Sequence, residues 1–165
     1  MRNELLPQGM RIELARRADA AAIAVLSRDL IETGLGWSWR MPRVLRAIDN
    51  AESTVIKLAA GASLAGFAVM RFGREEAHLD LLAVRPEFRR AGNGAALVRW
   101  LEASALTAGI SIVRLELRRS NAPARRFYAR LGYSPCRIVS GYYQGREDAL
   151  QMARDLWCDL PINAT

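Results

Sequence analysis

Residues 84–94 read Val-Arg-Pro-Glu-Phe-Arg-Arg-Ala-Gly-Asn-Gly, the end of an apolar run followed by a short basic turn and a Gly-x-Gly pair. Residues 77–84, before the turn, are mostly apolar and predict a strand. Residues 95–107, after it, place Leu97 and Leu101 on one apolar face of a helix. A strand, a tight turn and a helix N-terminus predict a diphosphate site, because unpaired backbone N–H groups and the helix dipole favour anions there.

The glycines and arginines of this turn strengthen the prediction. Gly92 and Gly94 permit positive φ and let ligand oxygens approach without a Cβ in the way. Arg89 and Arg90 add two cations at the mouth of the site. The segment is not a P-loop, because no Gly-Lys-Ser/Thr follows, and it lacks the three-glycine spacing of a dinucleotide fingerprint. A bare glycine pair also occurs in ordinary strand-to-helix turns, so the prediction depends on the flanking strand and helix.

With that strand and helix, the Arg-x-x-Gly-x-Gly pattern resembles the acetyl-CoA-binding segment of the GNAT family of N-acetyltransferases. The resemblance implies that loop amides hold the pyrophosphate of acetyl-CoA and that the end of the preceding strand pairs with the pantetheine arm. Ala91 and Asn93 depart mildly from the family pattern, which more often has a basic residue or glutamine and an apolar residue there. The cofactor-binding positions implied are Leu82, Ala83, Val84, Arg89, Arg90, Ala91, Gly92, Asn93, Gly94 and Ala95.

A second segment, residues 121–133, reads Asn-Ala-Pro-Ala-Arg-Arg-Phe-Tyr-Ala-Arg-Leu-Gly-Tyr and predicts a short helix. Asn121 is a favoured N-cap and Gly132 a favoured stop. The segment resembles the GNAT Asn-x-x-Ala-x-x-Phe-Tyr-x-x-x-Gly motif. The resemblance implies that Asn121 bonds the pantetheine arm and that the hydroxyl of Tyr128 lies beside the thioester sulfur as general acid. The alternative is that Tyr128 is a plain core aromatic on an amphipathic helix.

Residues 110–118 alternate between apolar and charged side chains and predict a strand. Glu116 is its one carboxylate, between Arg114 and Arg118. It is either part of a charge ladder on a solvated face or a base that takes a proton from an ammonium group, since an amine attacks a thioester only when neutral.

Residues 142–152 read Tyr-Tyr-Gln-Gly-Arg-Glu-Asp-Ala-Leu-Gln-Met and resemble the last hairpin of the ribosomal-protein-alanine N-acetyltransferases within the GNAT family. That group also carries a Leu-Glu-x-Arg-x-Ser-Asn stretch, as residues 115–121 do here, and uses its glutamate as the base. The resemblance implies that Glu116 is the base, that Tyr142 and Tyr143 line the acceptor cleft, and that the acceptor is the α-amine of a protein N-terminus. A small-molecule amine as acceptor, or a module that binds acyl-CoA without chemistry, are the alternatives.

The first third of the chain predicts a strand, two helices and a strand hairpin. Trp37 and Trp39 fall in the loop between the two helices, residues 33–39. They either fill the gap between helices and sheet or, as the same region does in GNAT enzymes, line the acceptor cleft.

The whole chain therefore predicts an α/β fold in a single GNAT domain, residues 1–165. We expect a mixed, twisted sheet of about seven strands flanked by about four helices. The central strands that end at Val84 and begin at Ser111 are expected to be parallel, because a helix connects them, and to splay apart around the pantetheine arm.

Composition agrees with this prediction. The chain has 165 residues, 51% of them hydrophobic, and no apolar run approaches the roughly 18 residues of a membrane helix. The net charge of +7 comes from arginines spread along the chain, and we expect no specific nucleic-acid binding because no nucleic-acid motif accompanies them. His78 is the single histidine, interpreted as structural, and no metal site is expected. A cytoplasmic location is expected from the lack of a signal-peptide pattern, and the oligomeric state is left open.

Overall fold

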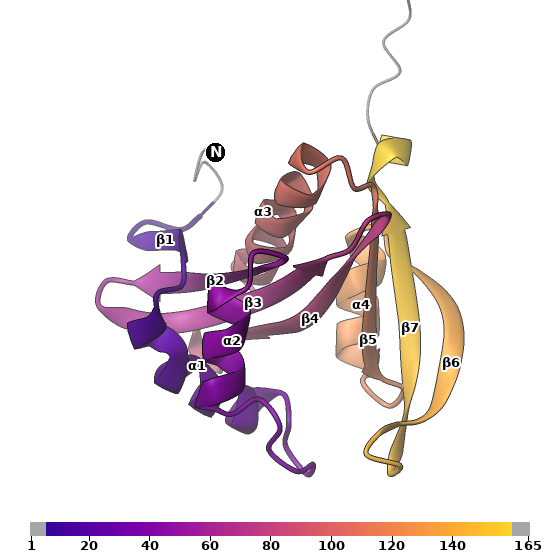
Figure 1. Cartoon of the computed structure of the whole chain (residues 1–165), viewed down its shortest axis with the longest axis horizontal. Coiled ribbons are helices and arrows are strands. Elements are labelled where there is room, and N and C mark those ends of the chain that lie inside the picture. The colour runs from indigo at the N-terminus through magenta and orange to yellow at the C-terminus, as the bar shows by residue number, and fades with distance from the viewer. Residues whose placement is uncertain (1–5, 160–165) are drawn as a thin grey trace, which may run out of the picture. The chain divides into compact units, whose positions relative to one another are not determined.

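The computed structural model describes residues 6–159, and its elements follow the predicted order (Figure 1). The strands are β1 (Met10–Leu14), β2 (Ser53–Ala60), β3 (Ser63–Phe72), β4 (Glu76–Val84), β5 (Ile112–Arg118), β6 (Ser134–Tyr143) and β7 (Glu147–Asp155). The α-helices are α1 (Ala20–Leu30), α2 (Met41–Asp49), α3 (Asn93–Thr107) and α4 (Ala122–Arg130). The predicted boundaries differ from these by one or two residues, as is usual where helix and strand ends fray.

The strands form a seven-stranded sheet in the order β1-β2-β3-β4-β5-β7-β6. Strand β1 is antiparallel to β2, β2 to β3, β5 to β7, and β6 to β7. Glu76 of β4 contacts Arg114 of β5, and two residues further along both strands His78 contacts Glu116. Since both pairs advance in the same direction, β4 and β5 are parallel there, as predicted. The sheet is therefore mixed, and the expected splay of these strands stays a prediction.

The described residues cluster in two compact units. The first consists of the chain up to Arg71 together with Leu79–Leu101, and the second of Phe72–His78 together with the chain from Glu102. The start of β4 belongs to the second unit and the rest of β4 to the first. That the chain is a single domain stays a prediction.

In the first unit, apolar side chains of α1 and α2 form a core with those of β2, β3 and β4. Its members are Ala20, Ile23, Ala24, Leu26, Trp39, Val44, Val55, Phe67, Val69, Leu81 and Ala83. Asp19, the residue before α1, makes no side-chain cap bond to that helix. Its carboxylate accepts a hydrogen bond from the backbone N–H of Arg16 at 2.7 Å and pairs with Lys57 Nζ at 2.9 Å. Partial burial acts to raise the pKa of Asp19. The hydrogen bond from the Arg16 backbone and then the Lys57 ammonium outweigh it, so the pKa of Asp19 is lowered.

In the second unit, β6 and β7 form the long hairpin at the orange and yellow end of the chain (Figure 1). A buried polar group supports it. The Tyr133 hydroxyl donates to Glu102 Oε1 at 2.8 Å, and Arg154 of β7 pairs with Glu102 at 2.9 Å. Because both partners satisfy the buried carboxylate, the chain after α4 is anchored to β7.

Candidate active site

The end of β4, residues Leu82–Val84, lies in the first unit and is shaped by a close approach of main chain. A Cβ built on Gly66 of β3 would lie 2.6 Å from the carbonyl oxygen of Ala83 and 3.3 Å from Val84 Cα. Only glycine leaves room for β4 there. Beyond the strand, Arg89 Nε donates to the carbonyl oxygen of Val84 at 2.7 Å, so this arginine also fixes the turn.

The loop Arg89–Ala95 has the backbone of an anion site, although its glycines act differently from the prediction. Gly92 has φ +80° and Arg90 has φ 64°, both in the left-handed region. Gly94, the second glycine that permits positive φ, does not use this freedom, because it lies in the first turn of α3, which begins at Asn93. Nothing lies within 4 Å of a Cβ built on Gly92, so the space above the turn is open. An exposed turn with arginines at a helix N-terminus fits a polyanionic group such as the acetyl-CoA pyrophosphate.

Asn93 supports this loop from the inside. Its side chain is buried, 2% exposed, and its Nδ2 donates to the carbonyl oxygen of Phe88 at 2.8 Å. The amide therefore ties the turn after β4 to the first residue of α3, a role that the sequence pattern did not indicate.

In the second unit, α4 carries the predicted Asn121 and Tyr128. Asn121 caps the helix, since its Oδ1 accepts from the backbone N–H of Ala124 at 3.1 Å. Tyr128 is buried, with its ring edge-on to Phe127 and Tyr133 at 5.0 and 5.6 Å between centroids. Burial, with a smaller contribution from the Tyr143 phenol, raises the pKa of Tyr128 well above the ordinary tyrosine value. The hydroxyl is therefore held in its protonated form, as a proton donor must be.

Glu116 does not lie on a solvated face. Its side chain is 8% exposed, Oε2 contacts His78 Nε2, and Oε1 accepts from Gln151 Nε2 at 2.8 Å. The arginines beside it on β5 have carboxylate partners of other strands: Arg114 pairs with Glu76 at 2.5 Å and Arg118 with Glu147 at 3.4 Å. Glu116 is therefore shielded from solvent and bonded at both oxygens, and its role as a base stays a prediction.

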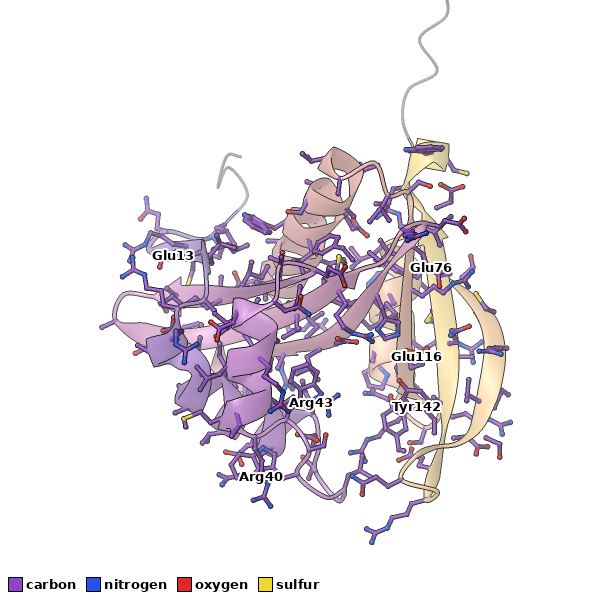
Figure 2. The ribbon with its side chains drawn as sticks, in the orientation of Figure 1. Glu13, Arg40, Arg43, Glu76, Glu116 and Tyr142 are labelled. Carbon is purple, nitrogen blue, oxygen red and sulfur yellow. The ribbon has the colours of Figure 1, made fainter. Side chains whose placement is uncertain are left out.

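Tyr142 and Tyr143 end β6, next to the turn at Gln144 and Gly145. Their rings meet edge-on at 5.0 Å, and the Arg118 guanidinium lies 5.8 Å from the centre of the Tyr143 ring. Tyr142 is 47% exposed, which leaves its ring accessible (Figure 2). Burial is the main cause that raises the pKa of Tyr143, followed by the neighbouring Tyr142 and Glu116.

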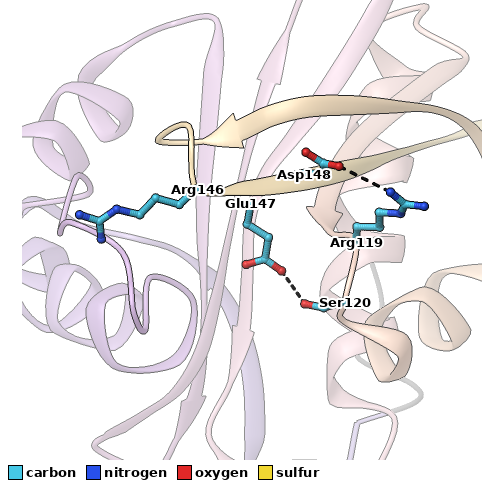
Figure 3. Close-up of a pocket in the computed structure, with 5 residues that line it drawn as sticks. All are labelled: Arg119, Ser120, Arg146, Glu147 and Asp148. Atoms are coloured by element: carbon cyan, nitrogen blue, oxygen red, sulfur yellow. Dashed lines mark hydrogen bonds and ion pairs between the residues drawn. The ribbon is translucent and has the colours of Figure 1, made fainter.

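Arg146, Glu147 and Asp148 of this hairpin line a pocket of about 530 Å³ together with Arg119 and Ser120, which follow β5 (Figure 3). Glu147 accepts from Ser120 Oγ at 2.5 Å, and Asp148 pairs with Arg119 at 3.5 Å. A backbone N–H from Gly141 is the first cause that lowers the pKa of Asp148. Both acids are therefore satisfied within the unit, whereas the Arg146 side chain extends away from the two pairs in Figure 3.

Trp37 and Trp39 are largely structural in the first unit. Trp39 belongs to its core and is 9% exposed, while Trp37 Nε1 donates to the carbonyl oxygen of Ala24 at 3.1 Å. Buried Glu32 holds their loop by accepting from the backbone N–H of Ser38 at 2.8 Å and of Trp39 at 3.1 Å. Arg28 and Arg40 lie 5.3 and 5.2 Å from the Trp37 ring centre. A role of either tryptophan in acceptor binding stays a prediction.

Sequence reasoning missed two partners of Glu116, namely His78 and Gln151. Strand alternation places His78 and Glu76 on one face of β4, but the register that brings them to Glu116 and Arg114 of β5 cannot be read from a single sequence. Within residues 6–159, no group of three or more His, Cys, Asp or Glu is placed to hold a metal ion. Over the same residues, every helix is too short or too polar to cross a membrane.

An open glycine turn at a helix N-terminus, a buried protonated tyrosine and a shielded carboxylate are typical of α/β group-transfer enzymes with a phosphate-bearing donor. Residues 21–133 match the acetyltransferase (GNAT) family. The chain therefore belongs to the GNAT family, and it is an acetyl-CoA-dependent N-acetyltransferase.

Similar proteins agree with this assignment. The chain is 34% identical over 137 residues to a ribosomal protein bS18-alanine N-acetyltransferase from Salmonella typhimurium, covering 75% of this chain and 93% of the relative. The crystal structure of the ribosomal-protein-S18-alanine N-acetyltransferase from Escherichia coli superposes with a TM-score of 0.77 at 27% identity, covering 89% and 94% of the two chains. The structure of Ard1 from Thermoplasma volcanium gives 0.80 at 26% identity, covering 90% and 98%.

Proposed function

We propose that the acceptor is the α-amine of a protein N-terminus, acetylated by direct attack on acetyl-CoA in a ternary complex. The observation that supports this most is the shielded Glu116, whose strand and following Ser-Asn match the glutamate stretch of the ribosomal-protein-alanine enzymes. An α-amine has a pKa near 8, so part of it is neutral at physiological pH and modest basic assistance suffices. A lysine side chain, near 10.4, would need about 3 kcal/mol more.

In this proposal the chain's own groups divide the work. The backbone of Arg89–Ala95 binds the pyrophosphate, and the end of β4 with Asn121 aligns the pantetheine arm. Acetyl-CoA supplies the thioester. A backbone N–H near Val84 polarises its carbonyl, and Glu116, directly or through an intervening group, removes the ammonium proton.

Tyr128 protonates the departing thiolate. Its raised pKa does not prevent this, because a thiolate formed in buried surroundings is made more basic by the same desolvation.

The exposed ring of Tyr142 and the pocket that Arg146 and Glu147 help to line are proposed to receive the acceptor peptide. This hairpin is the segment that resembles the ribosomal-protein-alanine group. A cytoplasmic location is part of the proposal, because acetyl-CoA and nascent or ribosomal protein N-termini occur together there.

In the test, the enzyme is incubated with labelled acetyl-CoA and with peptides that begin with alanine, serine or methionine. Separate reactions contain polyamines, aminoglycosides or amino-acid esters in place of the peptides. Mass spectrometry then locates the acetyl group. We expect turnover of the alanine peptide at the α-amine, and no turnover of the same peptide when its N-terminus is blocked. Turnover of small amines without any peptide would overturn this acceptor while leaving the enzyme class intact.

A further inference from the structure

A row of polar side chains crosses four strands in the second unit, through His78 of β4, Glu116 of β5, Gln151 of β7 and Arg137 of β6. Glu116 lies opposite Gln151 in the β5–β7 register, and Gln151 lies opposite Arg137 in the β6–β7 register. His78 contacts Glu116, Gln151 donates to Glu116 at 2.8 Å, and Arg137 Nε donates to Gln151 Oε1 at 3.2 Å. The contacts of Gln151 with Glu116 and with Arg137 follow from the registers of β7 with β5 and β6, so this part of the row is built into the sheet. Glu116 is labelled in Figure 2.

The contact between His78 and Glu116 defines where protons lie. With Glu116 in its ionised form, which has no donor, the close contact requires the hydrogen on Nε2 of the imidazole. The neutral ring is then the Nε2–H tautomer, which carries its lone pair on Nδ1. Gln151 donates to the other oxygen of Glu116, so the side chain is held at both oxygens and can orient the ring.

His78 and Glu116 differ in their exposure to solvent. The side chain of His78 is 26% exposed, whereas that of Glu116 is 8% exposed and is bonded at both oxygens. The histidine is therefore the member of the pair that solvent reaches more easily.

The surrounding charges are largely paired. Two residues before Glu116 on β5, Arg114 pairs with Glu76, and two residues after it, Arg118 pairs with Glu147. The phenol of Tyr143 also interacts electrostatically with Glu116. A positive charge that forms on His78 thus finds the Glu116 carboxylate as its direct partner.

We propose that His78, oriented by Glu116, is the group that takes the proton from the acceptor ammonium. This rests on the proposed transfer to an amine. The N–H bond of the ammonium breaks, the proton moves to His78 Nδ1 directly or through one water, and the electron pair stays on the nitrogen that attacks the thioester. The result is an imidazolium–carboxylate pair that later releases its proton to solvent.

Ordinary pKa values favour this division of labour. A free glutamate titrates near 4.3, an imidazole near 6.5 and an α-amine near 8, so an imidazole is much the closer match to the amine. The carboxylate then stabilises the imidazolium that forms, as in other carboxylate–histidine pairs of enzymes.

The test compares His78→Gln with Glu116→Gln, the double variant and the wild type, using acetyl-CoA and the alanine peptide. Glutamine at position 78 can still donate to Glu116 but cannot take a proton. We expect His78→Gln to lower kcat/KM about a hundredfold near pH 7 and to remove the acid limb of its pH profile, with an unchanged acetyl-CoA Kd. The kcat/KM of the double variant should be no lower than that of the less active single variant, because the pair acts as a unit. Glu76→Gln, on the same face of β4, is the matched control and should keep the wild-type profile.

A second measurement needs no turnover. His78 is the single histidine of the chain, so its ring signals in a proton–nitrogen spectrum are unambiguous. We expect nitrogen shifts of the Nε2–H tautomer, and a titration midpoint that moves to lower pH in Glu116→Gln, because the carboxylate no longer stabilises the imidazolium.

A His78→Gln enzyme with full activity and an unchanged profile would overturn the proposal, and so would ring signals that are the same with and without the Glu116 carboxylate. If the wild type acetylates a small amine and no peptide, the acceptor proposal fails, and the same variants on that amine still decide the role of His78.

Discussion

The Arg89–Ala95 loop in the first unit and the residues proposed for acid–base chemistry in the second, Tyr128, Glu116 and His78, represent two ways of building a site. The loop depends on main chain, through the left-handed φ values at Arg90 and Gly92 and the N–H groups at the start of α3. The acid–base residues depend on side chains, each held by burial or by a hydrogen-bonded neighbour. Recognition by backbone groups tolerates many side chains and fails when a substituted residue cannot adopt the required φ value. Proton transfer fails when one functional group is lost.

The largest effect is expected on the side-chain part. Tyr128→Phe removes one hydroxyl and should lower kcat about a hundredfold or more, the usual scale for a lost general acid, with an unchanged acetyl-CoA Kd. Steady-state kinetics and calorimetry measure the two quantities. The matched control is Tyr133→Phe, another buried tyrosine, whose hydroxyl serves Glu102 and whose loss should reduce the melting temperature but not kcat. A fully active Tyr128→Phe enzyme, or ping-pong kinetics with an acetyl-enzyme, would contradict direct transfer with this acid.

Binding of acetyl-CoA by the Arg89–Ala95 loop should weaken when a substitution disfavours the backbone conformation of the loop. Gly92→Val places a β-branched residue at φ +80°, which costs about 1–2 kcal/mol and should raise the acetyl-CoA Kd about tenfold. The strain is conformational, because nothing lies within 4 Å of the new Cβ. Ala91→Val, at an exposed neighbouring position, is the control and should change the Kd little. Equal Kd values for both variants would show that the loop backbone does not set the affinity.

Comparing these parts also shows what the sequence could and could not predict. Helix and strand order, the turn at Gly92 before α3 and the helix that carries Tyr128 were predictable because each depends on a local pattern: periodicity, capping or glycine spacing. The row from His78 to Arg137 was not, because it joins four strands whose register is set by the packing of the whole sheet. The supporting roles of Asn93 and Glu32 were not predicted for a similar reason. Nothing in a single sequence shows that a polar side chain will be buried against a particular carbonyl or N–H group.

A smaller effect separates stability from binding within the loop. Asn93→Ala removes the hydrogen bond to the Phe88 carbonyl, worth about 1 kcal/mol net, and should lower the melting temperature by about 2–4 °C. The acetyl-CoA Kd should change less than in Gly92→Val, because the side chain faces inward. Thermal unfolding and calorimetry on both variants provide the comparison. A Kd as weak as that of Gly92→Val would mean that the Asn93 side chain itself recognises the ligand.

The smallest effect appears in alkaline solution. Burial raises the pKa of Tyr133 in the folded chain above the value near 10 of an unfolded tyrosine. Above pH 10 the unfolded state therefore loses a proton that the folded state keeps, and the stability present below pH 10 declines as the pH rises. At pH 10.5 the loss should be about 0.8 kcal/mol for this tyrosine. Urea unfolding at pH 8 and 10.5 measures it, and Tyr133→Phe should show a correspondingly smaller decline.

Gly66 has a consequence for how this enzyme tolerates mutation. It lies on β3, yet any side chain there would press on the carbonyl of Ala83 and the Cα of Val84, the residues expected to guide the pantetheine arm. A survey of random variants selected for lost acetyl-CoA binding should therefore recover position 66 as often as positions in the loop itself. Its intolerance would come from the space that it leaves to a neighbouring strand, so a map of cofactor contacts alone would overlook it.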